Sequence, residues 1–495
     1  MSSSDWPRPV LPLTYEEPCR TMADVASASH EFDLIVLGGG TGGYVAAIRA
    51  TQLGLKVAVV EELKLGGTCL HRGCIPTKAF LKSADIFDDV KRAAEFGVNV
   101  GGEVTFDYGT ALGRSVKIVD GQYKGLLYLF EKKHKIPVFM GRGRFLDKST
   151  VGVTPNDGSA PLSLRAKTVI INTGSRPRPI KGVPYNGTTV INSDHAVLLD
   201  YLPKSFLIRG GGATGVEWAS IYHRYGSKVT LVGNMVPNED QEVLDALTRS
   251  FSRQKMDLAL GARPTADDID VNGDTSVTMR IKDAKGKGRT VEAETLLVAV
   301  GRQGNIEDIG LEEIGVTTDG DYIPVDSMMR TNIAGVYAIG DVNGRQLLAH
   351  TAMHHGIIAV EHLCDLNPFP LDELNSPSCT YCEPEIGSVG LSEQTAVELG
   401  HTVKIGKFPM KPNAKANIEG HTDGFTKIVA DADTNDLLGV HIIGPHATEL
   451  IAEAGLARLL ESTPYELSIA VHPHPTVSEV LGEAAHDLLG HAIHI

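Results

Sequence analysis

The chain has 495 residues, more than one hydrophobic core usually organises, which points to roughly two to four domains. Its hydrophobic content of 42% is ordinary for a globular protein, and no stretch approaches the roughly 18 apolar residues that a membrane-spanning helix needs. The net charge of -15 argues against nucleic-acid and anionic-membrane surfaces, which need clustered Lys and Arg. Small molecules and proteins are the expected partners.

The N-terminal segment and the cysteine usage indicate the compartment. Residues 1–30 mix Pro, Ser and acidic residues without the basic start and continuous apolar run of a secretory signal, and we expect a flexible extension there. The six cysteines are too sparse in a chain of this length for a secreted disulfide scaffold. Both observations favour a reducing cytoplasm.

The segment FDLIVLGGGTGGYVAAIRATQLGLKVAVVEE, which begins at Phe32, reads as a βαβ unit. Gly38, Gly40 and Gly43 give the pattern G-x-G-x-x-G, which permits a tight turn, close approach of a pyrophosphate and close packing of helix on strand. Glu61 lies 18 residues after Gly43, where a carboxylate accepts hydrogen bonds from a ribose 2'-hydroxyl. Glycines alone also make ordinary turns, but the triplet, its strand context and the acid together predict a dinucleotide site.

The stretch GGTCLHRGCIPTK follows this unit and places Cys69 and Cys74 five residues apart. A regular helix would separate them by about 7.5 Å in rise alone, beyond comfortable disulfide geometry, so the helix is expected to be irregular there. Gly73 and Pro76 flank Cys74, and both disrupt a regular helix. Thiolates near a helix N-terminus have a lowered pKa and exchange readily. The pair therefore reads as a redox-active disulfide rather than as two buried free cysteines.

A second βαβ unit is predicted about 170 residues later, in SFLIRGGGATGVEWASIYHRYGSKVTLVG. Gly210, Gly212 and Gly215 repeat the glycine triplet, but Gly233 occupies the position of the expected acid. No Arg closely follows Gly233 to hold a 2'-phosphate, so the choice between NAD and NADP stays open, and we expect NAD to be preferred. Asn234 is a candidate ligand of the ribose.

Further segments complete the pattern: VYAIGDV with LLAH, GVHIIGPHATELI, and HPHPTVSE. With GGTCLHRGCIPTK they resemble the pyridine-nucleotide disulfide oxidoreductases, and within that family the branch that oxidises dihydrolipoamide, along nearly the whole chain after about residue 31. The resemblance implies an α/β fold with two Rossmann-like dinucleotide-binding domains plus a C-terminal α+β dimerisation domain. The expected divisions are 1–30 for the extension, 31–180 for FAD, 181–304 for NAD, 305–375 returning to the FAD domain, and 376–495 for the interface.

The resemblance also assigns roles to single residues. Cys69 exchanges with the substrate, Cys74 faces the flavin, Lys78 lies near the flavin and pairs with Glu217, and His474 is the acid-base group that Glu479 orients. FAD binds at Gly38, Gly40, Gly43, Glu61, Thr173, Gly174, Asp341 and Ala349, and NAD binds at Gly210, Gly212, Gly215 and Gly301. Chemistry supports the histidine pair, because a dithiol must lose a proton near neutral pH, where imidazole titrates.

The expected assembly is a homodimer whose C-terminal domain completes the partner's active site, serving lipoyl domains of 2-oxoacid dehydrogenase complexes or the glycine-cleavage H protein. No metal site, nucleic acid or membrane is expected. The alternatives are a glutathione- or mercuric-reductase-like enzyme, and a catalytically weak structural subunit of a multienzyme complex. His472 competes with His474 for the acid-base role, His355 stands where an acid is common in the family, and Cys379 with Cys382 read as free structural cysteines.

Overall fold

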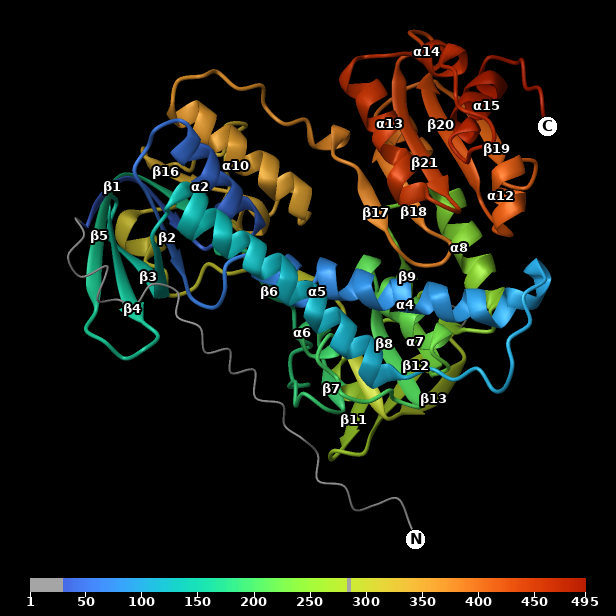
Figure 1. Ribbon diagram of the computed structural model, residues 1–495, viewed down its shortest axis with the longest axis horizontal. Helices are drawn as coiled ribbons and strands as arrows, with labels where there is room; N and C mark the ends of the chain where they lie inside the picture. The colour runs from blue at the N-terminus through green and yellow to red at the C-terminus, as the bar shows by residue number, and fades with distance from the viewer. Residues whose placement is uncertain (1–29, 283–285) are drawn as a thin grey trace.

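The computed structural model describes residues 30–282 and 286–495, and Figure 1 shows two α/β units and a C-terminal sheet with its helices. The extension expected for residues 1–30 lies almost wholly outside the described residues. Within the described part of the chain, no helix is both long and apolar enough to cross a membrane. The predicted fold class is confirmed.

The first βαβ unit forms where the sequence predicts it. Strand β1 (Glu31–Leu37) lies between β2 (Val57–Glu61) and β5 (Leu162–Ile171) in a parallel sheet, and β16 (Val336–Ala338) pairs with β5. Helix α2 (Thr41–Gln52) connects β1 to β2. Most residues of β1 and all of β2 are buried, as expected for a parallel sheet covered on both faces. The glycine turn therefore lies at the carboxyl end of β1, where α/β sheets bind ligands.

Strands and helices distant in sequence complete the first unit. Strand β3 (Val138–Asp147) pairs in parallel with β2 and then antiparallel with β4 (Thr150–Pro155), which pairs with β5. Helix α10 (Ala349–Leu363) lies against α2, since a Cβ on Gly356 would be 2.7 Å from the carbonyl oxygen of Gly42. The chain thus returns to the first unit with β16 and α10.

Two long helices link the two α/β units. Helix α4 (Cys74–Arg92) follows the short α3 (Gly67–Arg72) and packs on α5 (Tyr108–Tyr128). Helix α4 also packs on α7 (Ala213–Arg224) of the second unit, and Figure 1 shows α4 extending along that unit. The helix that begins at Cys74 is therefore held by both units.

The second βαβ unit also forms as predicted, from β8 (Ser205–Gly211), α7 and β9 (Lys228–Met235). Its sheet is fully parallel, in the order β10-β9-β8-β14-β7. The remaining strands of this sheet are β10 (Asp257–Ala259), β14 (Thr295–Val298) and β7 (Val190–Ile191). An antiparallel sheet lies beside it, made of β11 (Ile269–Asn272), β12 (Ser276–Lys282) and β13 (Gly288–Ala293).

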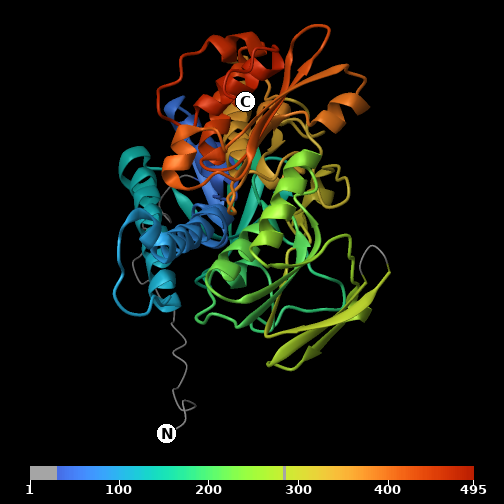
Figure 2. The same cartoon turned by 90° about the vertical axis from the view of Figure 1, so that its right-hand side faces the viewer.

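The C-terminal part is an antiparallel sheet in the order β17-β18-β21-β20-β19, with helices packed on it (Figure 2). Its strands are β17 (Ser378–Thr380), β18 (Ile386–Gly390), β19 (Val403–Pro409), β20 (Phe425–Asp431) and β21 (Leu437–Ile443). Helix α13 (Ala447–Leu459) packs on β18 and β21, and α15 (Glu479–Leu488) packs on β19 and β20. Helix α14 (Pro464–Ile469) begins with a capping box between Thr463 and Glu466.

The remaining elements are short, apart from α8. They are η1 (Ala93–Phe96), η2 (Leu129–His134), β6 (Ser175–Pro177), α6 (Ser193–Ala196), α8 (Gln241–Arg253), η3 (Ala266–Asp268), β15 (Arg302–Gly304), α9 (Leu311–Ile314), η4 (Gly340–Asn343), η5 (Glu373–Asn375), α11 (Glu393–Glu398) and α12 (Ala414–Glu419).

Candidate active site

The first glycine loop joins β1 to α2, and its backbone leaves little room for side chains. Gly38 has a φ of 103°, and a Cβ on it would clash with the carbonyl oxygen of Asn172. A Cβ on Gly43 would clash with the carbonyl oxygen of Gly38, so α2 packs directly on the end of β1. Gly40 caps α2 without a side-chain hydrogen bond, which leaves the first amide groups of the helix available to a ligand. This cradle fits the pyrophosphate of a dinucleotide such as FAD.

Glu61 ends β2, and its carboxylate reaches back to the glycine loop. Its Oε2 accepts a hydrogen bond from the Gly39 amide at 2.7 Å, and its Oε1 accepts from the amides of Leu63 and Lys64 at 2.7 and 3.1 Å. Burial raises the pKa of Glu61, and the three amides oppose that shift. The structure thus places this acid beside the cradle, where a ribose hydroxyl of a bound dinucleotide is expected.

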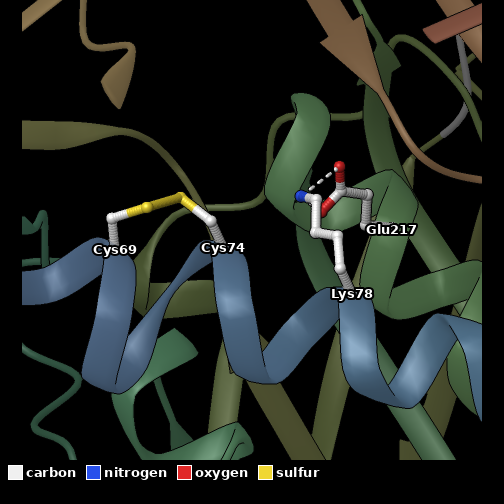
Figure 3. The surroundings of a disulfide bond; sticks show 4 residues. All are labelled: Cys69, Cys74, Lys78 and Glu217. Atoms are coloured by element: carbon white, nitrogen blue, oxygen red, sulfur yellow. Dashed lines mark hydrogen bonds and ion pairs between the residues drawn. A yellow bond between two sulfur atoms is a disulfide. The ribbon is translucent and has the colours of Figure 1, made fainter. Parts of the chain in front are cut away.

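Cys69 and Cys74 form a disulfide across a break between two helices (Figure 3). Helix α3 ends before Gly73, whose φ of -130° and ψ of -110° are not helical, and α4 begins at Cys74. The break brings the two cysteine Cα atoms to 4.7 Å, within the usual range for a disulfide. The helix irregularity predicted from the cysteine spacing is therefore present.

The disulfide-bearing segment begins against the first glycine loop. The Gly66 amide donates a hydrogen bond to the carbonyl oxygen of Gly39 at 2.8 Å. A Cβ on Gly67 would lie 2.7 Å from the Cα of Gly40, so only glycine permits this approach. Helix α3 is thereby fixed next to the cradle that fits a dinucleotide, and the disulfide cysteines lie three and eight residues after Gly66.

An ion pair lies on the same side of α4 as the disulfide (Figure 3). Lys78 follows Cys74 by one helical turn, and its Nζ donates to Oε1 and Oε2 of Glu217 at 3.0 and 2.8 Å. The Glu217 side chain, on α7, is only 7% exposed, and its Oε1 also accepts from the Tyr381 amide at 3.1 Å. The Lys78 ammonium lies 4.3 Å from the centre of the Tyr381 ring. Contacts with Glu217 of α7 and with the Tyr381 ring therefore fix the position of this ammonium.

Asp341 follows β16 and belongs to a polar network at the carboxyl ends of the first sheet. The Ser175 hydroxyl donates a hydrogen bond to Asp341, and Arg302 Nε donates to the Ser175 oxygen at 2.7 Å. Arg302 Nε also lies 3.7 Å from Asp341 Oδ2. Sequence reasoning missed Ser175 and Arg302, because neither belongs to a recognisable motif and only the fold brings them to Asp341.

The other residues assigned to the first dinucleotide lie at the same sheet edge. Thr173 and Gly174 follow β5; the Thr173 hydroxyl donates to the carbonyl oxygen of Asn305 at 2.7 Å, and Gly174 has a φ of 70°. Ala349 is the first residue of α10, whose start has no side-chain cap. His355, in α10, is fully buried, and burial together with the nearby charge of Arg345 lowers its pKa to about 4, so it is neutral at physiological pH.

His474 and Glu479 meet at the start of α15. His474 Nδ1 and Glu479 Oε1 are 2.8 Å apart, and Glu479 Oε2 accepts from the Thr476 amide at 2.9 Å. Burial acts to raise the pKa of Glu479, but the hydrogen bonds from His474 and Thr476 outweigh it and hold that pKa below its usual range. The His474 side chain is 71% exposed, so its other ring nitrogen is open to a substrate.

The competing histidine has a different environment. His472 Nε2 lies 2.8 Å from Glu453 Oε1, and the His472 side chain is only 10% exposed. The hydrogen bond to Glu453 raises the pKa of His472. Of the two candidates, only His474 combines exposure with a carboxylate that fixes one ring nitrogen.

No hydrogen bond or ion pair within residues 30–282 and 286–495 joins His474 or Glu479 to the helices that carry Cys69 and Cys74. Helix α15 packs instead on the C-terminal sheet. The structure of one chain therefore brings together Cys69, Cys74, Lys78 and Glu217, and separately His474 and Glu479.

The second glycine loop repeats the features of the first. Gly210 has a φ of 114°, and a Cβ on it would clash with the carbonyl oxygen of Ala299. A Cβ on Gly215 would clash with the carbonyl oxygen of Gly210, and Gly212 caps α7 without a side-chain hydrogen bond. Gly301 follows β14 with a φ of 124°. This cradle also fits the pyrophosphate of a dinucleotide.

The second cysteine pair does not form a bond. Cys379 and Cys382 are free, and their sulfurs contact the carbonyl oxygens of Thr448 and Pro384 respectively. Burial raises the pKa of Cys379 to about 12 and raises that of Cys382 as well, so both remain thiols. Both cysteines are therefore free, as expected; Cys382 is buried and Cys379 is partly buried.

Known proteins are similar to this chain along most of its length. A family model described as pyridine nucleotide-disulphide oxidoreductase matches residues 32–356, and the model of that family's dimerisation domain matches residues 376–485. The chain is 47% identical over 474 residues to a dihydrolipoyl dehydrogenase of Bacillus subtilis, covering 94% of this chain and 99% of the relative. It is 43% identical over 470 residues to one of Chlorobaculum tepidum, covering 94% and 98%. It also resembles the crystal structure of LpdA from Mycobacterium tuberculosis, with a TM-score of 0.84 at 27% identity over 92% of this chain and 99% of that one.

Proposed function

Because the chain belongs to the pyridine nucleotide-disulphide oxidoreductase family, we propose that it oxidises protein-bound dihydrolipoamide to lipoamide and passes the electrons through FAD to NAD. It would serve as the E3-type component of a 2-oxoacid dehydrogenase complex or of glycine cleavage. The observation that carries the proposal is the Cys69–Cys74 disulfide, which lies between the first glycine loop and the Lys78–Glu217 pair. Relatives named dihydrolipoyl dehydrogenase, which match 94% of the chain, support this choice of substrate.

The first chemical step is thiol–disulfide exchange at Cys69. A thiolate of dihydrolipoamide attacks the Cys69 sulfur, the bond to Cys74 breaks, and Cys74 leaves as a thiolate. The second substrate thiol gives its proton to His474 and attacks the substrate sulfur held on Cys69, so that lipoamide leaves and Cys69 is released. The substrate loses two electrons and two protons, and the cysteine pair gains the two electrons. After the step, one substrate proton resides on His474 and the proton lost when the attacking thiolate formed is in solvent. Cys69 and Cys74 are both thiolates, so the charges balance.

The pair of His474 and Glu479 is suited to accept that proton. With Nδ1–H donated to Glu479, the exposed Nε2 carries the lone pair that takes a proton from the substrate thiol. The lowered pKa of Glu479 keeps the carboxylate ionised at neutral pH, where it stabilises the imidazolium. The Thr476 amide holds the second carboxylate oxygen and so fixes the orientation of the pair.

Lys78 supports the thiolate form of the cysteine pair. Lys78 follows Cys74 by one turn of α4, and a positive charge near a cysteine favours the thiolate over the thiol. Glu217 and the Tyr381 ring hold the ammonium in place. When bound, the flavin supplies a two-electron acceptor for the thiol pair, and the nicotinamide supplies the final hydride acceptor.

In this proposal the two cofactors bind at separate glycine cradles. FAD binds at the first cradle with Glu61, and its remaining ligands come from the sheet edge that carries Thr173, Gly174, Asp341 and Ala349. NAD binds at the second cradle, formed by Gly210, Gly212, Gly215 and Gly301. The corresponding divisions of the chain are 31–180 and 305–375 for FAD, 181–304 for NAD, and 376–495 for the interface.

The dimerisation-domain match supports a homodimer, and the C-terminal part has a surface suited to one. Large apolar side chains are exposed around α13 and α14, including Leu459 at 66%, Leu460 at 67% and Val471 at 97%. Such a patch costs free energy when it faces water and marks an interaction surface. Val471 lies three residues before His474, so this interface would carry His474 to the partner's disulfide.

A steady-state assay of the purified holoprotein tests the proposal. We expect reduction of NAD that depends on dihydrolipoamide, and no comparable turnover of NADPH with oxidised glutathione or of mercuric ion. Turnover of glutathione or mercuric ion instead would favour the reductase alternatives. A flavin-loaded protein without any disulfide or dithiol turnover would favour a structural subunit and contradict the proposal.

A further inference from the structure

The two glycine loops differ in charge at the position that faces the adenosine ribose. In the first unit, Leu37 precedes the first glycine and Glu61 ends the second strand. At the equivalent positions of the second unit stand Arg209 and Gly233. The second unit therefore lacks the negative charge that Glu61 gives the first. It also has a positive charge, Arg209, one residue before the loop.

The side chain of Arg209 reaches the place that the missing acid would occupy. Arg209 lies on β8, paired with Val232 of β9 and Val298 of β14. Its Nη1 lies 3.6 Å from the point where a Cβ of Gly233 would be, and that point is 3.5 Å from the Gly211 amide nitrogen. In the first unit, the equivalent Gly39 amide donates to Glu61. The guanidinium thus lies beside the second loop, close to the site of the ribose.

Arg209 has no acidic partner among the residues that the structure describes. Its guanidinium is half-buried, and its Nε donates to the carbonyl oxygen of Pro264 at 3.4 Å. Burial lowers the pKa of Arg209, and the positive charge of the exposed Arg263 adds to that effect. In the part of the chain that the structure describes, no carboxylate forms an ion pair with Arg209 or Arg263. Two guanidinium groups at one sheet edge without counter-ions indicate an anionic ligand.

The backbone beside Arg209 does not favour an acidic side chain at the position equivalent to Glu61. Gly233 has a φ of 129°, so the position is strained for any residue with a Cβ. Val236 follows with a φ of 33°, a rare conformation for a β-branched residue, and its amide donates to the carbonyl oxygen of Gly211 at 2.7 Å. The connection after β9 therefore folds tightly against the glycine loop and places no acidic side chain at Gly233.

We propose that the second unit accepts a dinucleotide with a 2'-phosphate on its adenosine ribose, NADP, as well as NAD, and that Arg209 with Arg263 binds this phosphate. The assignment rests on the proposed function, which makes the second unit the nicotinamide site. A carboxylate at the ribose excludes a 2'-phosphate by repulsion, whereas a guanidinium binds it through charge-assisted hydrogen bonds. Arg209 is then the residue that sets the dinucleotide specificity.

Equilibrium binding of two adenosine fragments tests the proposal directly. Adenosine 2',5'-bisphosphate and adenosine 5'-monophosphate are titrated into the holoprotein by calorimetry. We expect the bisphosphate to bind about 10- to 100-fold more tightly, because it alone reaches the guanidinium groups. Arg209→Leu, which introduces the residue found at the same position of the first unit, should remove most of this preference and leave binding of the monophosphate nearly unchanged.

Two further variants keep the result interpretable. Arg263→Ala changes an exposed loop residue and should reduce the preference without disturbing the sheet, even if Arg209→Leu fails to fold. Lys228→Leu removes a positive charge from the opposite end of β9 and should retain the preference. Equal binding of the two fragments to the wild type, or an equal loss of preference in Lys228→Leu, would overturn the proposal.

Kinetics separate this proposal from the proposed function. Wild-type reduction of a dye by NADPH should proceed with a kcat/KM within about tenfold of that for NADH, and Arg209→Leu should lower only the NADPH value, by about 10- to 100-fold. If dihydrolipoamide is not oxidised but this preference holds, the proposed function fails and the phosphate site stands. If dihydrolipoamide is oxidised with NAD while NADP and the bisphosphate are rejected, the phosphate site fails alone.

Discussion

Glu217→Gln removes the counter-ion of Lys78 while keeping the shape of the side chain. Glu217 accepts two hydrogen bonds from Lys78 and one from the Tyr381 amide, and a neutral amide oxygen cannot replace the charge-assisted pair. Such a bond contributes about 1.5–3 kcal/mol when buried. Because a third of the Lys78 side chain is exposed, screening by water reduces the expected loss of unfolding free energy to about 1–2 kcal/mol.

The same change should slow catalysis more than it lowers stability. When the Lys78 ammonium is free to leave its position beside residue 217, it no longer favours the proposed Cys74 thiolate. A displacement of this kind costs about 10- to 100-fold in kcat. The assay pairs steady-state oxidation of dihydrolipoamide with urea unfolding of the same holoprotein, monitored by circular dichroism. Retention of flavin shows that the cofactor site is intact.

Asp88→Asn provides a matched control on the same two helices. Arg224 of α7 bonds Asp88 and Asp85 of α4 at 2.6 and 2.7 Å, far along α4 from the disulfide. This variant should lose a comparable free energy of unfolding, because Asp85 still compensates part of the Arg224 charge, and should keep the wild-type kcat. Wild-type kcat in Glu217→Gln, or an equal loss of kcat in Asp88→Asn, would refute a role for the Lys78–Glu217 pair in the reaction.

Three further outcomes follow from the site. His474→Ala should slow dihydrolipoamide oxidation by about 10²- to 10⁴-fold with little change in flavin content. Tagged heterodimers of this variant with Cys69→Ser should recover about half of the wild-type activity per dimer, because one of the two sites keeps both groups. No recovery would show that the site is not shared. The Glu453 carboxylate raises the pKa of His472 in the folded protein. The His472–Glu453 pair therefore stabilises the fold fully below the ordinary histidine pKa, and this contribution is lost as the pH rises through the raised pKa of His472. Glu453→Gln should therefore lower Tm at about pH 6 and approach the wild-type Tm by about pH 9, whereas a pH-independent difference would contradict this pairing. Glu61→Ala should weaken FAD binding by about 10- to 100-fold, measured from the fluorescence of released flavin, and unchanged affinity would remove Glu61 from the site.

The parts of the fold that local sequence determines were predictable. Both βαβ units consist of buried strands, glycine turns and apolar-faced helices that are contiguous in sequence. The spacing of the apolar residues and of the glycines was therefore enough to predict both units. The break in the helix near Gly73 was predictable because five residues of regular helix would separate Cys69 and Cys74 by more than the usual Cα–Cα distance in a disulfide. The meeting of Lys78 with Glu217 could be expected only from the resemblance, because 139 residues separate them.

The parts that depend on strand order were not predictable in the same way. Arg209 precedes the glycine loop, so a search for a phosphate ligand among the residues after Gly233 does not find it. The pairing of β8 with β9 nevertheless brings its guanidinium beside Gly233. Ser175 and Arg302 reach Asp341 through pairing of two short strands that no periodicity indicates. His472 and His474 differ in burial, which the sequence does not reveal because the two histidines stand in one motif with a single residue between them.

The central claim is that the Cys69–Cys74 disulfide takes electrons from dihydrolipoamide. Trapping the cysteines tests it most directly: the holoprotein receives one equivalent of dihydrolipoamide without oxygen and without NAD, then an alkylating agent, and the labelled peptides are identified by mass spectrometry. We expect alkylation to appear at Cys69 first, because in the proposed mechanism Cys74 faces the flavin. We expect none before addition of the substrate and none gained at Cys379 or Cys382. Formation of lipoamide with Cys69 and Cys74 still unlabelled would contradict the account.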